Sequence, residues 1–197
     1  SASEAWERIL NNLVLKKSIH FVQGNFGERW YNYARDMQLS PERIFKPRGE
    51  GFEDIAALNL MRDPEVELIC TTQNETSTGV LFPLEEMYRL KTLYPNALLC
   101  SDIVSSAPYV DINYRQMDSS FFVVQKGFGL PAGLGVWIVN DRCLMRFQTI
   151  AAHKNISPHN RLDVLYENYQ KKQTPFTPNV LLIYLLGRVA EDMNKRG

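Results

Sequence analysis

Cysteine, histidine and long apolar runs are scarce in this sequence, and an excess of either charge is missing. The 197 residues hold three cysteines, Cys70, Cys100 and Cys143, without a C-x-x-C pair, which argues against a disulfide framework and predicts buried, reduced thiols. No apolar run approaches the ~20 residues that cross a bilayer, and the N-terminus lacks the layout of a signal peptide. Lys plus Arg equals Asp plus Glu at 22 each, so nothing favours nucleic acid or an anionic membrane. A soluble, cytoplasmic protein without a metal site is predicted.

The residues that are present predict one domain of alternating helices and strands. Hydrophobic residues make up 45% of the chain, enough for a single core over residues 1–197. Short apolar runs predict strands at 18–24, 65–72, 97–102, 119–126 and 135–141. This alternation is typical of an α/β fold with three layers, α/β/α, around a mostly parallel sheet.

Apolar spacing and capping residues predict where the helices lie. A first helix is expected behind Ser3, which would cap it ahead of Glu4. Further helices are predicted at 25–37, 51–61 and 83–95, then a loop over 149–163, a helix from about Pro158, a turn at 173–179 and a long closing helix.

Polar, charged or aromatic side chains follow four of the predicted strands. Phe26 comes after the first strand, Thr76 and Ser77 after the second, Asp102 ends the third and Lys126 ends the fourth. In parallel sheets, ligands bind beyond the carboxyl ends of the strands. We therefore expect these five side chains to meet at one edge of the sheet.

A lysine beside an aspartate and an aromatic ring is the set of groups that pyridoxal 5′-phosphate needs. Lys126 would bond its aldehyde, Asp102 would keep its ring nitrogen protonated, Phe26 would stack on the ring, and the amides of residues 1–3 would bind its phosphate. Each group also has an ordinary explanation: a solvated lysine, a helix cap, a core residue or a simple turn. The residues taken singly leave both interpretations open.

Three longer segments resemble a known family. "NETSTGVLFPLEEM", "SDIVSSAP" and "VVQKGFGLPAGLGVWIV" resemble the class V aminotransferases, fold-type-I enzymes that use pyridoxal 5′-phosphate, and the resemblance runs over nearly the whole chain. It implies that Lys126 binds the cofactor covalently and later moves the substrate Cα proton, and that Asp102 pairs with the ring nitrogen. It also implies that Thr76 bonds the ring hydroxyl, that Val104 packs below the ring and that Phe26 stacks on it.

The resemblance further implies a phosphate site shared between two subunits. Ala2 and Ser3 match the family's phosphate-binding turn, and Gln125 matches another phosphate ligand. Thr174 matches a threonine that reaches the phosphate of the neighbouring subunit. A homodimer with shared active sites is therefore expected.

The branch of the family is indicated by two positions where cysteine desulfurases carry histidine. Here those positions are Gln125 and Phe26, which favours aminotransferases acting on small amino acids and 2-oxo acids. "GNFGERW", "NETSTG" and "TPFTPN" look most similar to the branch that transfers the amino group of phosphoserine to 2-oxoglutarate in serine biosynthesis. The alternatives are a serine or alanine aminotransferase that uses glyoxylate or pyruvate, and a non-catalytic module with the same fold.

Substrate residues are harder to assign. The donor phosphate would need cations, and the predicted loop offers His153, Lys154, His159 and Arg161. The alternative explanation of these residues is a solvated surface loop. Relatives are longer, and the chain is expected to be the large, cofactor-binding domain without the family's N-terminal segment and C-terminal small domain. The arginine for the substrate carboxylate would lie in that small domain.

Overall fold

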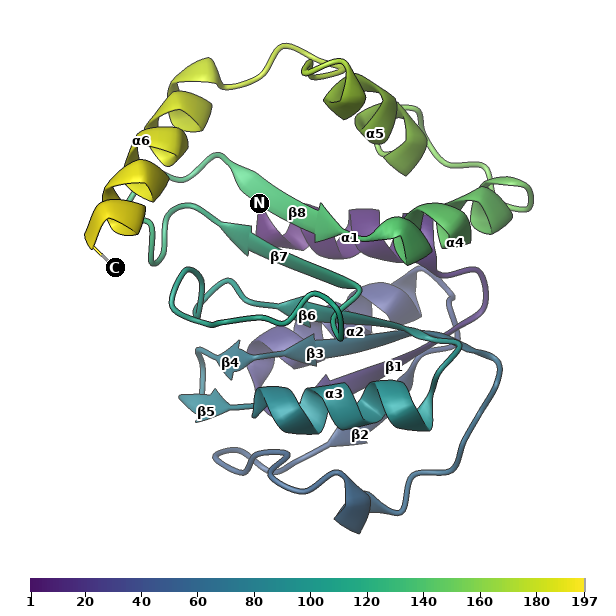
Figure 1. Cartoon of the computed structure of the whole chain (residues 1–197). Coiled ribbons are helices and arrows are strands. Elements are labelled where there is room, and N and C mark those ends of the chain that lie inside the picture. The colour runs from purple at the N-terminus through teal and green to yellow at the C-terminus, as the bar shows by residue number, and fades with distance from the viewer. Residues whose placement is uncertain (197) are drawn as a thin grey trace.

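A six-stranded sheet forms the centre of the fold (Figure 1). The computed structural model describes residues 1–196, and the strand order is β2-β1-β3-β6-β7-β8. The strands are β1 (Lys17–Val22), β2 (Glu42–Phe45), β3 (Val66–Thr72), β6 (Leu98–Asp102), β7 (Ser119–Val123) and β8 (Gly135–Val139). All pairs are parallel except β7 with β8. A short ribbon, β4 (Asn74–Glu75) with β5 (Val80–Leu81), follows β3.

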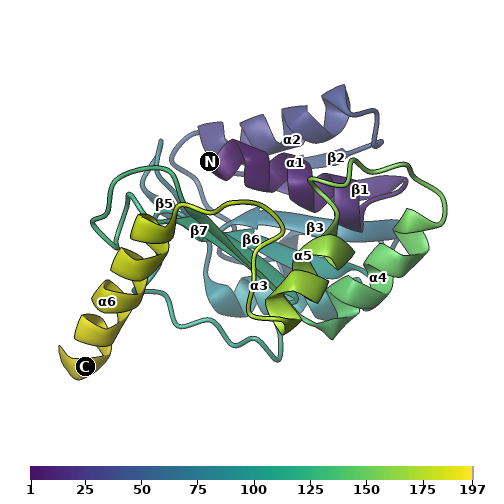
Figure 2. The ribbon, with the colours of Figure 1, turned by 90° about the horizontal axis from the view of Figure 1, so that it is seen from above.

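Helices cover both faces of the sheet. On one face lie α1 (Ala2–Leu13) and α2 (Asn25–Asp36), and on the other lies α3 (Leu84–Leu93), as Figure 2 shows from above. The chain continues through α4 (Asp141–Ala151), α5 (Leu162–Gln170) and α6 (Val180–Arg196), and the last two stand beyond β8 in Figure 1. The predicted three-layer α/β/α fold with a mostly parallel sheet is confirmed.

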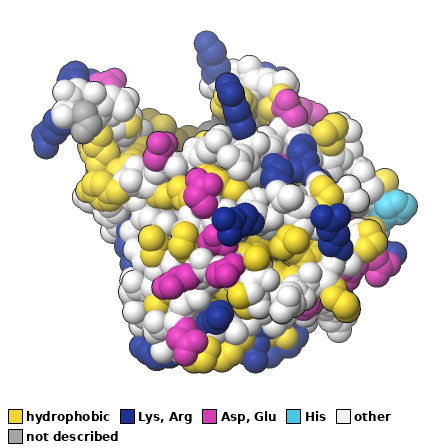
Figure 3. All heavy atoms as spheres, turned by 60° about the horizontal axis from the view of Figure 1, so that its bottom comes forward, with side chains coloured by type: hydrophobic (Ala, Val, Ile, Leu, Met, Phe, Trp, Pro, Cys, Tyr) yellow, Lys and Arg dark blue, Asp and Glu magenta, His cyan; other side chains and the backbone are white. Residues whose placement is uncertain are grey.

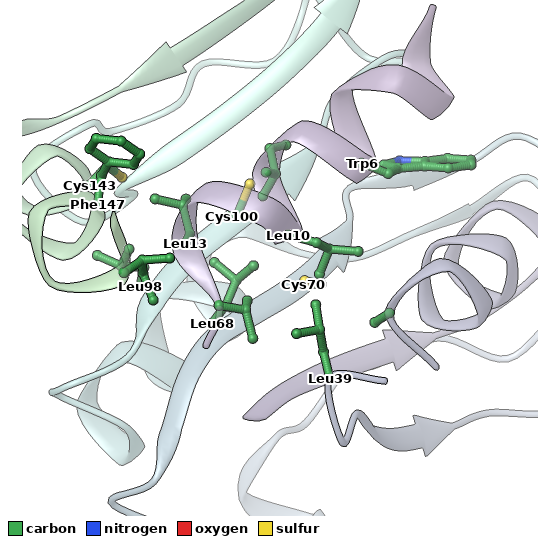
Figure 4. Close-up of a cluster of buried hydrophobic side chains, with 14 of the residues drawn as sticks. Trp6, Leu10, Leu13, Leu39, Leu68, Cys70, Leu98, Cys100, Cys143 and Phe147 are labelled. Atoms are coloured by element: carbon green, nitrogen blue, oxygen red, sulfur yellow. The ribbon is translucent and has the colours of Figure 1, made fainter. Parts of the chain in front are cut away.

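Two apolar cores separate the layers because successive strand residues point to opposite faces. On β3, Leu68 and Cys70 pack in the core beneath α1, whereas Ile69 packs in the core beneath α3. Leu10 and Leu13 of α1 are fully buried in the first core (Figure 4). The three cysteines are buried and unpaired, as predicted.

The helix predicted at 51–61 is wrong, because only Ala56–Leu58 form a 3₁₀ turn. Phe52 and Ile55 are buried against α3, so their spacing reflects a segment that lies on the core without being helical. Its N–H groups bond to side chains: Ile55 N donates to Glu86 at 2.9 Å, and Ala56 N donates to Asp54 at 3.0 Å. These acceptors replace the carbonyls that a helix would supply.

The order of elements after β8 also differs from the prediction. Helix α4 was missed, although Asn140 caps it by accepting from Cys143 N, and Cys143, Phe147 and Ile150 give it a buried face at helical spacing. Helix α5 begins at Leu162 and not near Pro158. The predicted loop is confined to the stretch between these two helices.

Two smaller differences concern the cap of α1 and the edge strand β2. Ser1, and not Ser3, caps α1, in a capping box with Glu4. The edge strand β2 was missed because three of its four residues are exposed, so it lacks the apolar alternation that marks a strand.

The surface carries mixed charge. Figure 3 shows Lys and Arg side chains interspersed with Asp and Glu over one face of the molecule, in keeping with a formal net charge of zero. In the part of the chain that the structure describes, no helix is long and apolar enough to span a bilayer.

We predict that His20 makes the fold sensitive to acid. Its ring on β1 is 1% exposed, lies 3.0 Å from the Ser18 hydroxyl and meets Trp30 edge to face. Burial lowers its pKa from 6.5 to about 3, so only the unfolded chain gains a proton as the pH falls below 6.5. Stability should therefore decrease between pH 6.5 and 3, by up to ~1.4 kcal/mol per pH unit.

Denaturant unfolding of a His20→Phe variant at several pH values tests this. Phenylalanine keeps the aromatic contacts and cannot titrate, so its stability should vary less between pH 6.5 and 4.5 than that of the wild type. His159→Phe, the same substitution at an exposed position, is the control. Equal pH dependence in the wild type and the His20 variant would show that this histidine is not the cause.

Candidate active site

A pocket lies at the carboxyl ends of the parallel strands. Its lining comes from residues that end or follow β3 and β6, from the lysine that follows β7, and from the first turns of α1 and α2. The lining residues are Ala2, Phe26, Thr72, Asn74, Thr76, Asp102, Val104, Ser105 and Lys126. The predicted meeting of Phe26, Thr76, Asp102 and Lys126 is therefore confirmed. Ser77 instead faces Glu75, to which its hydroxyl donates at 2.8 Å.

Asp102 is a buried carboxylate that two N–H groups hold in place. Its side chain accepts from Trp6 Nε1 at 3.2 Å and from Val104 N at 2.9 Å, and no cation of residues 1–196 pairs with it at ion-pair distance. Burial raises its pKa to about 7, against the lowering effect of these two hydrogen bonds; the charge of Glu75 raises it further and that of Lys126 lowers it. Both oxygens keep lone pairs for another donor, which fits a protonated ring nitrogen.

Trp6 is held by other aromatic residues. Its ring stacks on Trp30 at 6.4 Å and meets Tyr33 edge to face at 5.7 Å, and the Arg29 guanidinium lies over it at 5.6 Å. The indole N–H therefore points at Asp102 from a fixed ring. Sequence reasoning missed this contact, because a large aromatic residue on a helix is usually explained by core packing.

Lys126 is presented by a tight turn at the end of β7. Its carbonyl accepts from Gly129 N at 2.9 Å, and Gly129 has a φ of +65°, which favours glycine. A Cβ on Gly127 would lie 2.3 Å from Ala107 O, so only glycine lets the backbone pass this close. The ammonium group has no carboxylate partner within residues 1–196.

Hydroxyl groups line the rest of the pocket. Thr76 and Ser105 hydrogen-bond each other through their hydroxyls. Thr72 Oγ1 is buried and has no protein partner within residues 1–196. Sequence reasoning missed Thr72, Asn74 and Ser105, although the first two end or follow β3 as polar residues and the strand-end rule extends to them.

The first turn of α1 suits an anion. Ala2 lines the pocket and Ser3 is half-buried next to it. Neither backbone N–H donates to an acceptor within residues 1–196, and the N-terminus of a helix attracts negative charge. The pocket thus provides a lysine, a buried carboxylate, apolar walls from Phe26 and Val104, and free amides, which fits pyridoxal 5′-phosphate.

Two of the residues assigned to the phosphate do not line this pocket. Gln125 is exposed beside Lys126, and Thr174 is exposed between α5 and α6, where its hydroxyl donates to Phe176 O at 2.8 Å. Their roles, like that of Ser3, stay predictions.

The four residues assigned to substrate also lie outside the pocket of their own chain. Lys154 Nζ lies 3.5 Å from Val14 O, just past the end of α1 that is remote from Ala2, and a helix of this length spans about 18 Å. His159 stacks on Phe176, and Arg161 pairs with Asp163. The role predicted for His153, Lys154, His159 and Arg161 has no geometric support within one chain.

We predict that Asp102→Asn stabilises the protein in the absence of cofactor. A pKa raised from 3.8 to about 7 means that the folded state binds its proton more tightly than the unfolded state, so the carboxylate lowers stability as the pH rises from 4 to 7. This cost has an upper bound of about 4 kcal/mol, and the amide NH₂ facing Trp6 removes part of the gain. The variant's melting temperature should exceed that of the wild type at pH 8 but not at pH 4. Equal melting temperatures at pH 8 would contradict the prediction.

Several known proteins are similar to this chain. The family model for class-V aminotransferases matches residues 32–197. A solved phosphoserine aminotransferase from Cytophaga hutchinsonii is 41% identical, with a TM-score of 0.94 over 99% of this chain and 54% of that chain. A phosphoserine aminotransferase from Rhodococcus opacus is 28% identical over 98% of this chain and 50% of its own length.

A more distant likeness supports the fold alone. An alanine–glyoxylate aminotransferase from Nostoc is 23% identical, with a TM-score of 0.84 over the whole of this chain and 52% of that chain. The chain thus spans about half the length of the relatives it matches. The family match over most of the chain and the geometry of the pocket lead to the same conclusion: this chain belongs to the class-V aminotransferase family.

Proposed function

We propose that the protein is a pyridoxal 5′-phosphate-dependent aminotransferase that takes its amino group from phosphoserine and gives it to 2-oxoglutarate. The observation that carries the proposal is the meeting of Lys126 and Asp102 in one pocket with Phe26, Thr76 and Val104. A module without catalysis has no physical reason to keep an unpaired ammonium group and a buried carboxylate together.

The residues of the pocket have distinct tasks. When bound, pyridoxal 5′-phosphate supplies an aldehyde and an electron-withdrawing ring that acidifies the Cα–H of an amino acid. Asp102 keeps a proton on the ring nitrogen, Phe26 and Val104 provide apolar contact with the ring, and Thr76 binds its hydroxyl. The free amides of Ala2 and Ser3 hold the phosphate, and Gln125, which is exposed beside Lys126 and does not line the pocket, is its further predicted ligand.

Lys126 acts as both anchor and base. Its amine would hold the cofactor through the aldehyde, and as a free amine it would take up and give back the proton of the substrate Cα. The glycines at 127 and 129 let the backbone turn sharply beside this group. Because the lysine has no carboxylate partner within residues 1–196, its amine is available for both tasks.

The choice of donor rests on the relatives. The solved relative at 41% identity and the Rhodococcus opacus relative at 28% identity are named phosphoserine aminotransferases, and a Mycobacterium leprae relative at 30% identity is named a putative one. For the alternative, serine or alanine as donor with glyoxylate or pyruvate as acceptor, the Nostoc likeness at 23% identity shows a shared fold and does not bear on the donor.

A homodimer is part of the proposal. Helix α6 exposes apolar side chains on the described surface, including Val180 at 67%, Leu181 at 65% and Tyr184 at 62%. Apolar side chains exposed side by side favour a protein partner. The connection before α6 carries Thr174, which the family resemblance assigns to the neighbouring subunit's phosphate.

We predict that Lys126 holds the cofactor covalently. The protein purified with pyridoxal 5′-phosphate should absorb visible light, and borohydride should bleach it and fix the cofactor on the peptide containing "VVQKGFG". Lys126→Ala should abolish this labelling and lower transamination by at least about 100-fold. Lys154→Ala, a change at a lysine outside the pocket, is the control and should label normally. Labelling of any other lysine in the wild type would refute the assignment.

We predict that phosphoserine is the amino donor. Rapid mixing with phosphoserine should remove the visible band of the bound cofactor, whereas serine or alanine at equal concentration should react at least tenfold more slowly. The reverse order would assign the protein to the glyoxylate-type branch. No reaction with any of the three would refute both substrate assignments.

A further inference from the structure

Glu75 is a fully buried carboxylate that joins two walls of the pocket. One oxygen accepts from Phe26 N at 3.0 Å and from Gly27 N at 3.1 Å. The other accepts from Ser77 N at 3.1 Å and from the Ser77 hydroxyl at 2.8 Å. The side chain is 0% exposed and forms no ion pair within residues 1–196.

These bonds replace the local cap of α2. The helix begins after Gly24, which has no side chain to offer, so the first N–H groups need acceptors from elsewhere. Ser77 Oγ takes the N–H of Asn25 at 2.9 Å, and Glu75 takes the next two. The negative charge of Glu75 also lies at the positive end of the helix.

Gly24 is matched to this carboxylate. A Cβ on Gly24 would lie 2.4 Å from Glu75 Cγ and 2.7 Å from Ser77 Oγ. Any larger residue would push the acidic side chain away from the helix. The glycine and the glutamate therefore form one unit, although 50 positions separate them in the chain.

This unit connects α2 with the segment that follows β3, and each of these two elements provides a residue that lines the pocket. Phe26 is the second residue of α2, and its own amide is one of the bonded groups; Thr76 follows Glu75 directly in the chain. We infer that Glu75 is a positioning residue, which holds Phe26 and Thr76 at the separation that the cofactor ring requires. This inference rests on the proposed function, because the ring is the ligand of the pocket.

A purely structural role is the alternative, and Glu86 is the matched control for it. Glu86 is also a buried carboxylate, at 7% exposed, and it also accepts a backbone N–H, that of Ile55 at 2.9 Å; unlike Glu75, it pairs with an arginine, Arg89, at 2.9 Å. It does not line the pocket. Loss of its charge should reduce stability without reaching the cofactor.

The experiment measures the affinity of the wild type, Glu75→Gln and Glu86→Gln for pyridoxal 5′-phosphate by its visible band, together with their melting temperatures without cofactor. Glutamine keeps the shape of glutamate, but its NH₂ group would face N–H donors on one side and could not accept from them. We expect the dissociation constant of the Glu75 variant to rise about tenfold or more above that of the wild type. The dissociation constant of the Glu86 variant should stay within about twofold of the wild-type value, although its melting temperature should fall by a similar amount to that of the Glu75 variant. A Glu75 variant that binds as tightly as the wild type would overturn the inference.

A double-mutant cycle with Phe26→Leu adds a readout that stability does not affect. If Glu75 acts through Phe26, the Glu75 change should weaken binding less in the Phe26→Leu background than in the wild type. Full additivity would overturn the inference. Should Glu75→Gln not fold, Ser77→Ala, which removes one bond to Glu75 and the acceptor of the Asn25 N–H, should weaken binding about threefold, and unchanged binding would overturn the inference equally. Failure of the wild type to bind the cofactor would instead count against the proposed function.

Discussion

The burial of the Asp102 carboxylate at the carboxyl edge of the sheet is the constraint on which the site depends. A buried charge is costly unless hydrogen bonds or an opposite charge offset it, and here Trp6 Nε1 and Val104 N supply only the hydrogen bonds. The pKa of about 7 records the remaining cost. A ligand that brings a protonated nitrogen to this carboxylate removes that cost, so cofactor binding and the stability of the fold are linked.

A second buried aspartate differs from Asp102, because cations of the chain itself offset its charge. Asp118 lies just before β7, near the amino ends of the strands; Lys91 Nζ and Arg142 Nη1 lie 2.9 and 3.0 Å from one of its oxygens, and Leu99 N donates to the other at 2.9 Å. It ties α3 and α4 to the sheet and has no need of a ligand. One sheet thus carries a satisfied carboxylate at its amino edge and an unsatisfied one at its carboxyl edge, and only the second faces the pocket.

Much of this arrangement follows from the sequence, because strand alternation and the strand-end rule are local patterns. They placed Asp102, Lys126, Thr76 and Phe26 together, and the family resemblance supplied their roles. The bond from Trp6 and the cap from Glu75 were missed, since both join residues that lie far apart in the chain and depend on how the layers pack. The wrong prediction of a helix at 51–61 has the same cause. The N–H groups of Ile55 and Ala56 donate to side chains, which the spacing of apolar residues does not reveal.

The two helix N-termini at the pocket have different electrostatic states. Helix α2 is closed, because Glu75 and Ser77 take the N–H groups of its first three residues and place a negative charge at its end. Helix α1 keeps the N–H groups of Ala2 and Ser3 without an acceptor within residues 1–196. An anion in the pocket can therefore accept from the first N–H groups of α1 but not from those of α2. Glu75, by closing α2, leaves the N–H groups of α1 as the donors available to the phosphate of the proposed cofactor.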